Sequence, residues 1–271
     1  LEAFASPEAT RAQQLVLAVA TGDTATETRI RAELEAESPD SRDSTLRQVD
    51  RLLAAGNRAA AIRLLDEAAE RDPARMSGLR SVRRDLTGRD ELEPLRLDGL
   101  ALIRAYEDEH TGDHAAAGQV LVLDYMVVRY FDDGSSRTLI HQVTKIQDEQ
   151  SLERLGQISI RGNLLTLRSV KPDGRVLEPE AIAGLDSIPM SDLEIGDYVE
   201  YEYVTTSGPM INGAISNSGW SFQNYTEPFV FSQIIALLPE GVDLVVDRSG
   251  GAPEAVETRR GDLRQLTWTM E

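Results

Sequence analysis

The sequence predicts an α+β protein of two domains, in which α-helical hairpins precede an antiparallel β-sandwich. The main observation is a change in the spacing of apolar residues near Gly118. Before this residue, short segments rich in Ala, Arg and Glu carry apolar residues every three or four positions, as amphipathic helices do. After it, apolar and polar residues alternate in runs separated by Asp-Gly turns, which is typical of strands. The length of 271 residues also suits two domains.

Five helices are predicted in the first domain, residues 1–92. The first begins at Pro7, because Ser6 can cap a helix and proline suits a first turn, where an amide hydrogen has no partner. Residues that end helices separate the segments, for example Gly56 and Asn57, which tolerate left-handed backbone geometry. The predicted helices span residues 7–20, 25–37, 44–55, 58–71 and 74–86.

The fourth predicted helix has a regular pattern of small and large residues. Ala61, Leu65, Ala68 and Pro73 have the spacing found in the second helix of a tetratricopeptide repeat, which this segment resembles. The preceding helix departs from the pattern, because Val49 occupies the position of a small residue. The resemblance implies the last repeats of a longer array. Such repeats either offer a concave surface to partner peptides or shield the second domain, and both interpretations stay open.

Residues 93–118 are predicted to connect the two domains and to hold one amphipathic helix around Leu100 and Tyr106. His110 and His114 follow among acidic residues. Two His side chains four positions apart can bind a metal when they lie on one helical face. The glycine between them favours a solvated loop instead, so no metal site is predicted here.

The second domain is predicted at residues 119–271. The β-rich runs 120–130 and 137–146 flank a turn of two Asp residues and Gly134, which predicts a β-hairpin. Many short antiparallel strands at such spacing indicate two packed sheets, that is, a sandwich. Further strands are predicted near residues 157–160, 164–170, 198–204, 220–225, 229–238, 244–246 and 266–268.

The strand at 198–204 carries three of the six tyrosines of its domain. Val199, Tyr201 and Tyr203 share one face of it, whereas Glu200 and Glu202 lie on the other. We therefore expect the strand to be half buried. The acidic face is expected to be exposed to solvent, as charged faces of strands usually are.

Six motifs follow one another in the second domain: VVRY (127–130), DGS (133–135), ISI (158–160), KPDGRVLEP (171–179), LEIGDYVEYEY (193–203) and LLPEG (237–241). In this order they resemble an uncharacterised bacterial β-sandwich domain that precedes transglutaminase-like domains, and the similarity covers about residues 119–271. The resemblance implies that the chemistry belongs to the following domain, through a Cys-His-Asp triad. It also implies upstream helical repeats and a place in the periplasm or cell envelope of a Gram-negative bacterium.

Composition excludes several kinds of site and partner. The chain has no cysteine, so it has no thiolate nucleophile, disulfide or cysteine metal ligand. Its net charge of -18 repels phosphate backbones, so nucleic acid is not an expected partner. No apolar run is long enough to span a bilayer. Because the sequence begins at Leu1, we expect it to be a piece of a longer protein.

The predicted function is that of a non-catalytic accessory or interaction module, which positions a downstream transglutaminase-like domain in a larger bacterial protein. The alternative is a ligand-binding module for cell-envelope glycan or for a peptide strand. Trp220, Phe222 and Tyr225 are the candidate ligand contacts, because exposed aromatic rings can stack on sugars or peptides. The same residues could instead belong to the core of the domain.

A catalytic site can be assembled only in outline. His141 with Asp124 or Asp133 would give part of a hydrolase site, but no serine lies in a nucleophile-elbow pattern. A strand residue that pairs with a neighbour is the simpler interpretation of His141. We therefore predict no catalytic residue, no metal ligand and no cofactor.

Overall fold

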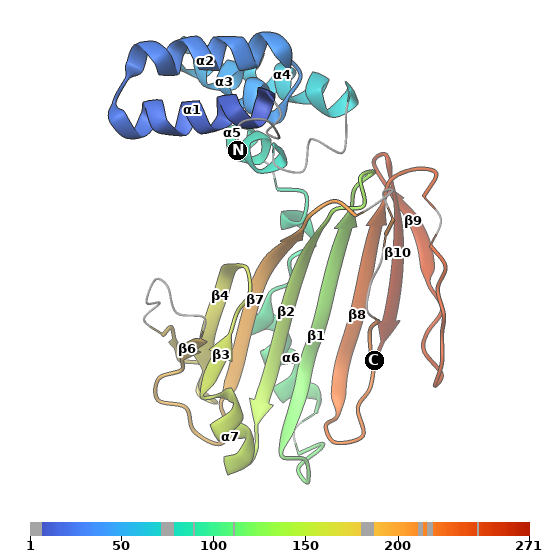
Figure 1. The fold of residues 1–271 in the computed structure, drawn as a ribbon. Helices are drawn as coiled ribbons and strands as arrows, with labels where there is room; N and C mark the ends of the chain where they lie inside the picture. The colour runs from blue at the N-terminus through green and yellow to red at the C-terminus, as the bar shows by residue number, and fades with distance from the viewer. Residues whose placement is uncertain are drawn as a thin grey trace. The chain divides into compact units, whose positions relative to one another are not determined.

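The chain divides into two compact units, Leu1–Arg89 and Asp90–Glu271 (Figure 1). The computed structural model describes residues 7–71, 79–88, 90–110, 112–179, 187–210, 214–215, 219–242 and 244–271. Helices make up the first unit in this part of the chain, and a large, mostly antiparallel sheet dominates the second. The predicted α+β class is therefore confirmed.

The first unit consists, where described, of helices that pack in consecutive pairs. α1 contacts α2, and α3 contacts α4. The side chains of Val49, Ala61, Leu65 and Leu79 form its buried core, so the predicted apolar stripe of the fourth helix does face inward. Pro73, the last residue of the repeat resemblance, lies outside the described residues. The helices are α1 (Pro7–Thr21), α2 (Thr24–Glu37), α3 (Arg42–Ala54), α4 (Arg58–Arg71) and α5 (Arg80–Thr87).

Side-chain caps mark the start of three of these helices, and at α4 the side-chain oxygen of Asn57 accepts a hydrogen bond from the amide of Ala60. The carboxylate of Asp23 accepts a hydrogen bond from the backbone amide of Thr26, at the start of α2. The hydroxyl of Ser41 accepts one from the amide of Ser44, at the start of α3. Each cap satisfies an amide that the first turn of a helix leaves without a partner, so local sequence determines where these helices begin.

One eight-stranded sheet is the frame of the second unit, with the strand order β5-β4-β7-β2-β1-β8-β10-β9. Its neighbouring strands are antiparallel except for β1 and β8, which are parallel. β3 (Gln157–Ser159) and β6 (Ser187–Pro189) form a separate two-stranded sheet. The strands of the large sheet are β1 (Gln119–Tyr130), β2 (Ser136–Ile146), β4 (Asn163–Val170), β5 (Val176–Leu177), β7 (Tyr198–Ser207), β8 (Phe229–Leu238), β9 (Val256–Arg260) and β10 (Leu263–Met270).

One large sheet dominates where a sandwich of two packed sheets was predicted, and the second sheet is the small one of β3 and β6. Residues 220–225 and 244–246, predicted as strands, are irregular segments. Side chains from both segments pack over β1, β8 and β10 in one apolar cluster. A strand that alternates apolar and polar residues can bury its apolar face under a sheet, a helix or a loop. The alternation therefore predicted burial correctly and the covering layer incorrectly.

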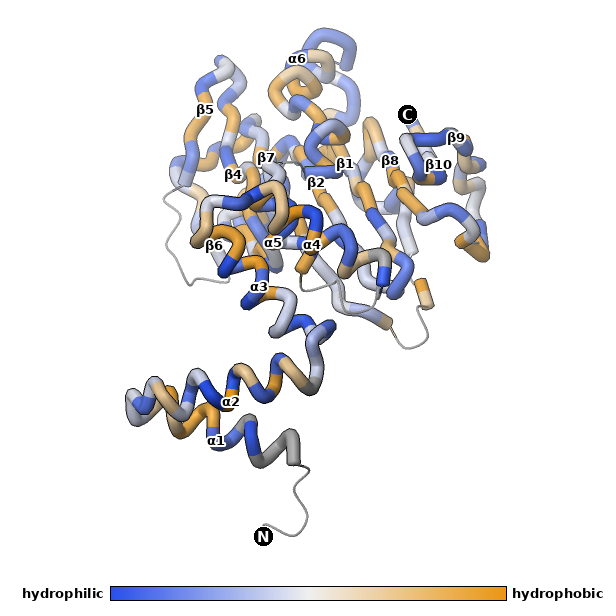
Figure 2. Tube along the Cα trace, turned by 90° about the horizontal axis from the view of Figure 1, so that it is seen from above, coloured by the Kyte–Doolittle hydropathy of each residue, from blue (hydrophilic) through white to orange (hydrophobic). Residues whose placement is uncertain are grey.

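Helix α6 (Gly99–Glu109) covers one face of the sheet. Asp98 caps it, and its buried side chains Ile103 and Tyr106 join the apolar cluster of β1, β2 and β7. The helix predicted within residues 93–118 is therefore present, and this segment belongs to the second unit. Seen from above, α6 lies on one side of the row of strands and β6 lies on the other (Figure 2).

The opposite face of the sheet is covered in two places. Helix α7 (Glu149–Leu155) and the small sheet of β3 and β6 pack over β2, β4 and β7. The irregular segments that contain Trp220 and Leu244 pack over β1, β8 and β10. The candidate site lies on this second face.

Candidate ligand-binding cavities

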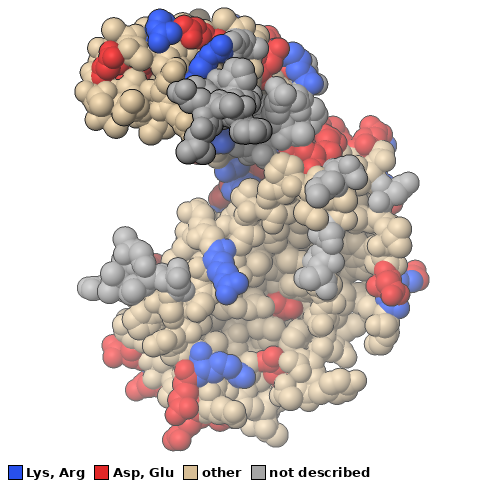
Figure 3. Space-filling model, in the orientation of Figure 1, with Lys and Arg blue, Asp and Glu red and all other residues tan. Residues whose placement is uncertain are grey.

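Two cavities lie on the sheet face opposite α6, with volumes of about 520 and about 430 Å³. Val128 lines the first cavity, whereas Val127, the preceding residue of β1, packs in the cluster beneath α6. Gly219 and Trp220 line both cavities, so the two are neighbours. The face of the second unit seen in Figure 3 shows few charged side chains.

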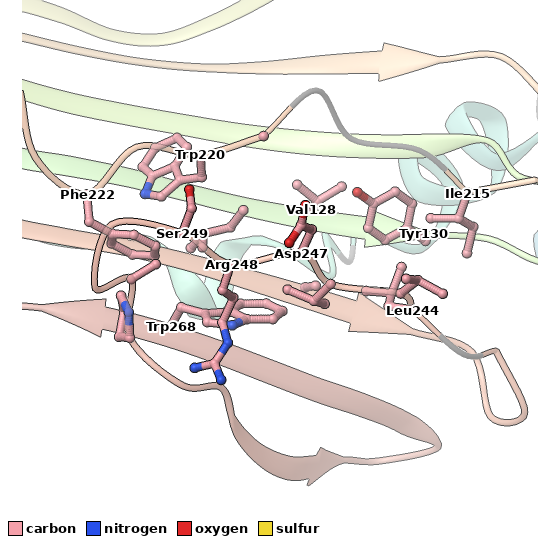
Figure 4. A pocket seen from close by; sticks show the side chains of 17 residues that line it. Val128, Tyr130, Ile215, Trp220, Phe222, Leu244, Asp247, Arg248, Ser249 and Trp268 are labelled. Carbon is pink, nitrogen blue, oxygen red and sulfur yellow. The ribbon is translucent and has the colours of Figure 1, made fainter.

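The first cavity has mainly apolar and aromatic walls (Figure 4). Strands β1, β8 and β10 contribute Val128, Tyr130, Ile234, Ala236 and Trp268. The covering segments contribute Ile215, Trp220, Phe222, Leu244, Val246 and Ala252, among others. Arg248 also lines the cavity, and its guanidinium pairs with Glu254 at 3.0 Å. A cavity of this size and composition suits an apolar or aromatic group of a ligand.

The three predicted contact residues do not lie together. Trp220 is half-buried, and its indole Nε1 donates a hydrogen bond to Ser232 Oγ at 3.1 Å. Phe222 is buried and lines the first cavity with Trp220. Tyr225 is fully exposed and does not line either cavity. The structure therefore brings Trp220 and Phe222 together and leaves Tyr225 apart from them.

Sequence reasoning missed two aromatic residues of the first cavity, Trp268 and Tyr130. Both lie on strands, β10 and β1, and were predicted only as strand residues. The chain has only 2 tryptophans, and this scarcity could have pointed to Trp268 once Trp220 was a candidate. Both tryptophans line this cavity, although 48 positions separate Trp220 from Trp268 in the sequence.

The second cavity has a buried carboxylate among its walls. Asp124 of β1 is 5 % exposed. Its Oδ1 accepts a hydrogen bond from Gln142 Nε2 at 2.6 Å, and Ser232 Oγ lies 3.5 Å from its Oδ2. The hydroxyl of Tyr201 donates to Gln142 Oε1, so a short chain of hydrogen bonds crosses β7, β2 and β1. Asp124, Gln142, Tyr201, Trp220, Arg154 and Glu227 all line this cavity.

Burial dominates the electrostatics of Asp124. Loss of solvation raises the pKa of its carboxyl to about 6, although the hydrogen bonds from Gln142 and Ser232 oppose this rise. The negative charge of Glu227 adds to the increase. The cavity therefore holds a carboxylate that ionises only at a cost and that would gain from a nearby cation.

The α6 face of the sheet also holds buried carboxylates, but these are paired. Glu200 and Glu202 are 2 % and 1 % exposed, so the prediction of a solvated acidic face is wrong. Arg168 Nε donates to Glu200 Oε2 at 2.7 Å. Arg96 Nε donates to the two oxygens of Glu202 at 2.9 and 3.0 Å. The residues before α6 cover this face and supply Arg96, which the sequence of the strand could not reveal.

His141 belongs to the same buried cluster. Its Nε2 lies 3.1 Å from Glu200 Oε1, so its partner is neither Asp124 nor Asp133. Burial raises the pKa of Glu200, but the hydrogen bonds from His141 and Arg168 outweigh this effect and lower it below its ordinary value. The geometry is that of an ion-paired structural cluster.

The start of α6 rests directly on this cluster. A Cβ atom at Gly99 would lie 2.3 Å from Glu200 Oε1, which is far inside a normal contact distance. Only glycine lets the helix approach the carboxylate so closely. The first turn of a helix also favours negative charge, so Glu200 and α6 stabilise each other.

Within the described residues, no group of three His, Asp or Glu side chains is arranged to hold a metal ion. His110 pairs with Asp113 at 3.2 Å, and its ring stacks on Tyr106. The same part of the chain contains no helix with the length and hydropathy of a membrane span.

The C-terminal part of the chain, residues 185–271, matches DUF3857, a domain of unknown function with solved structure. The match begins inside the region 119–271 for which the sequence motifs indicated a family resemblance. No curated protein matches the chain.

Several solved structures match part of the chain. A crystal structure named as a "putative protease" from Parabacteroides distasonis is 15% identical, with a TM-score of 0.46 over 57% of this chain and 35% of that one. An M1 zinc metallopeptidase from Deinococcus radiodurans is 12% identical, with a TM-score of 0.30 over 57% of this chain and 39% of that one. The chain thus spans little more than a third of either structure. At such identities and TM-scores, the activities of these proteins do not transfer to this chain.

Proposed function

We propose that the second unit is a non-enzymatic binding module, which takes an apolar side chain of a peptide or protein partner into the first cavity. The observation that carries this proposal is the cavity of about 520 Å³ whose walls include both tryptophans of the chain. Cavities with apolar and aromatic walls and a few polar groups at the edge are typical ligand sites.

The composition of the walls favours a peptide side chain over a glycan. Sugars need many hydrogen-bonding partners in addition to an aromatic platform, because each ring carries several hydroxyl groups. Val128, Ile234, Ala236 and Leu244 offer none, and the polar side chains of Asp247, Arg248 and Ser249 enter from one covering segment only. An apolar side chain needs no such partners, and its burial here would contribute about 1.5 to 3 kcal/mol.

We further propose that the module serves as an accessory part of a larger protein and positions a downstream transglutaminase-like domain. The order of the sequence motifs, from VVRY at 127–130 to LLPEG at 237–241, supports this part of the proposal. The absence of cysteine from the chain also supports it, because a thiolate nucleophile would have to come from another domain.

Intrinsic fluorescence tests the binding proposal directly, because both tryptophans line the cavity. The purified chain is titrated with pools of short, tryptophan-free peptides whose ends are capped, so that they carry no terminal charge. We expect a saturable change in emission with peptides that contain Leu or Phe. Phe222→Ala should weaken this binding about tenfold, which corresponds to ~1.4 kcal/mol.

Tyr225→Ala is the matched control, because Tyr225 is fully exposed and stands outside the cavity. It should leave the affinity unchanged. No saturable response to any pool, or equal losses in the two variants, would overturn the binding proposal. Robust amide or ester hydrolysis by the purified chain would contradict the non-enzymatic part.

A further inference from the structure

The second cavity differs from other places where this fold buries a carboxylate. Glu202 contacts Arg96, and Asp197 contacts Lys171 Nζ at 2.8 Å. In the described part of the chain, the hydrogen-bond partners of Asp124 are the neutral side chains of Gln142 and Ser232. Its charge is therefore not matched by a cation in the way that the charges of Glu202 and Asp197 are.

The remaining charged and titratable groups of the second cavity leave an excess of negative charge. Glu227 and Arg154 enter from the covering elements, and Tyr201 enters from β7. Arg154 donates a hydrogen bond to the side-chain oxygen of Gln119, and the side-chain nitrogen of Gln119 donates one to Glu227. The charged groups of Arg154 and Glu227 therefore both have a hydrogen-bond partner at this edge of the cavity. With Asp124 and Glu227 against Arg154, two negative charges face one positive charge.

The walls of the cavity also suit a cation. Trp220 and Tyr201 present aromatic rings to it, and aromatic faces attract cations that have left bulk water. The net charge of -18 adds a long-range attraction for basic ligands. Trp220 also lines the first cavity, so a ligand with two linked groups can reach both sites.

We propose that the second cavity binds a primary ammonium or guanidinium group, so that the ligand of the module carries a basic group beside its apolar one. The carboxylate of Asp124 is the counter-ion, with Glu227 and the ring of Trp220 beside it. This inference rests on the proposed function, because the apolar group of the same ligand occupies the first cavity. The chemical class of partner is then a peptide with a hydrophobic residue next to Lys or Arg.

Three small probes that share a phenyl group on a four-carbon chain, but whose head groups differ in charge, test the inference. 4-Phenylbutylamine is a cation at neutral pH, 4-phenylbutanol is neutral, and 4-phenylbutyrate is an anion. Binding to the full chain is followed by calorimetry and by tryptophan emission. We expect the amine to bind about tenfold more tightly than the alcohol, and the acid to bind most weakly.

Asp124→Asn should remove most of the tenfold preference for the amine over the alcohol. Asparagine has the shape of aspartate and can still accept the hydrogen bond from Gln142. Asp262→Asn makes the same change in net charge at an exposed turn, so it should keep the preference. A cooperative thermal unfolding transition shows that the Asp124 variant is folded.

The possible failures are distinguishable. If neither the amine nor the alcohol binds the unaltered chain, the proposed function itself is wrong. If both bind with equal affinity, or if Asp124→Asn keeps the tenfold preference, the cavity for a hydrophobic group stands and the cationic subsite is wrong.

Discussion

The two faces of the large sheet bury carboxylates in opposite ways. Under α6, Glu200 and Glu202 are held by His141, Arg168 and Arg96. On the other face, Asp124 has neutral partners and stands at the wall of a cavity. A paired buried charge holds a covering element in place, whereas an unmatched one costs stability that a ligand can restore. One face of the sheet therefore pairs its buried carboxylates with cations beneath a covering helix, and the other keeps a buried carboxylate beside a cavity.

The largest effect is expected at the ion pair under α6. Arg96→Ala leaves the carboxylate of Glu202 buried without its main partner and should lower the free energy of unfolding by about 3 kcal/mol. Urea denaturation at neutral pH measures this. Arg259→Ala breaks a pair whose side chains are both about 70 % exposed, and should cost less than about 1 kcal/mol. Equal losses would show that the α6 face does not depend on its buried pair.

The close approach of α6 to Glu200 gives the next prediction. Gly99→Ala improves helix propensity but places a methyl group on the carboxylate, so we expect a net loss of about 2 kcal/mol. Thermal unfolding of the variant measures the loss. Gly208 has open space around it, so Gly208→Ala is the matched control and should change stability little. A stabilised Gly99 variant would mean that Glu200 moves aside at no cost.

Removal of a charge from the cavity face should raise the free energy of unfolding. Asp124→Asn removes a buried charge and should stabilise the unliganded protein by about 1 to 2 kcal/mol at pH 7. The folded pKa of about 6 lies above the unfolded value of ~3.9, so the folded state binds more protons between these values. The destabilisation by Asp124 is therefore present above pH 6 and disappears as the pH falls below 4.

Glu200 sharpens this contrast, because its pKa is lowered in the folded state. Its contribution to stability is present above its ordinary pKa of 4.5 and is lost as the pH falls through the lower folded value. Glu200 is the same in the native chain and in Asp124→Asn, so it affects both alike. The urea midpoints of the two should converge between pH 7 and 4, because the destabilisation by Asp124 disappears over this range. Curves that stay parallel over this range would show that Asp124 is not desolvated.

The smallest effect is expected at Trp220. Trp220→Phe keeps an aromatic ring but loses the hydrogen bond from Nε1 to Ser232, which should cost about 1 kcal/mol. The variant leaves Trp268 as the remaining tryptophan, so its emission reports the β10 wall of the first cavity alone. A loss above about 3 kcal/mol would identify Trp220 as a core residue, not as a ligand contact.

Much of the secondary structure could be predicted from the sequence. Helix α2 (Thr24–Glu37) nearly coincides with the predicted 25–37, and the turn at Gly134 joins β1 and β2 as expected. These features depend on residues close together in the chain, whose local preferences are strong. The ligand contacts stay a prediction. Trp220 and Phe222 line the first cavity, whereas Tyr225 does not, since spacing within an irregular segment does not determine where a side chain points.

The sequence by itself determined the α+β class, the positions of most helices and strands, and the absence of cysteine chemistry. Only the tertiary structure decided what covers each face of the sheet. Alternation along β7 shows that Glu200 and Tyr201 face opposite ways, but burial depends on what packs against each face. Here Arg96, which lies 106 positions before Glu202 in the sequence, pairs with it, and Trp220 lies on the same face of the sheet as Asp124. Such long-range packing makes one acidic site structural and leaves the other beside a cavity.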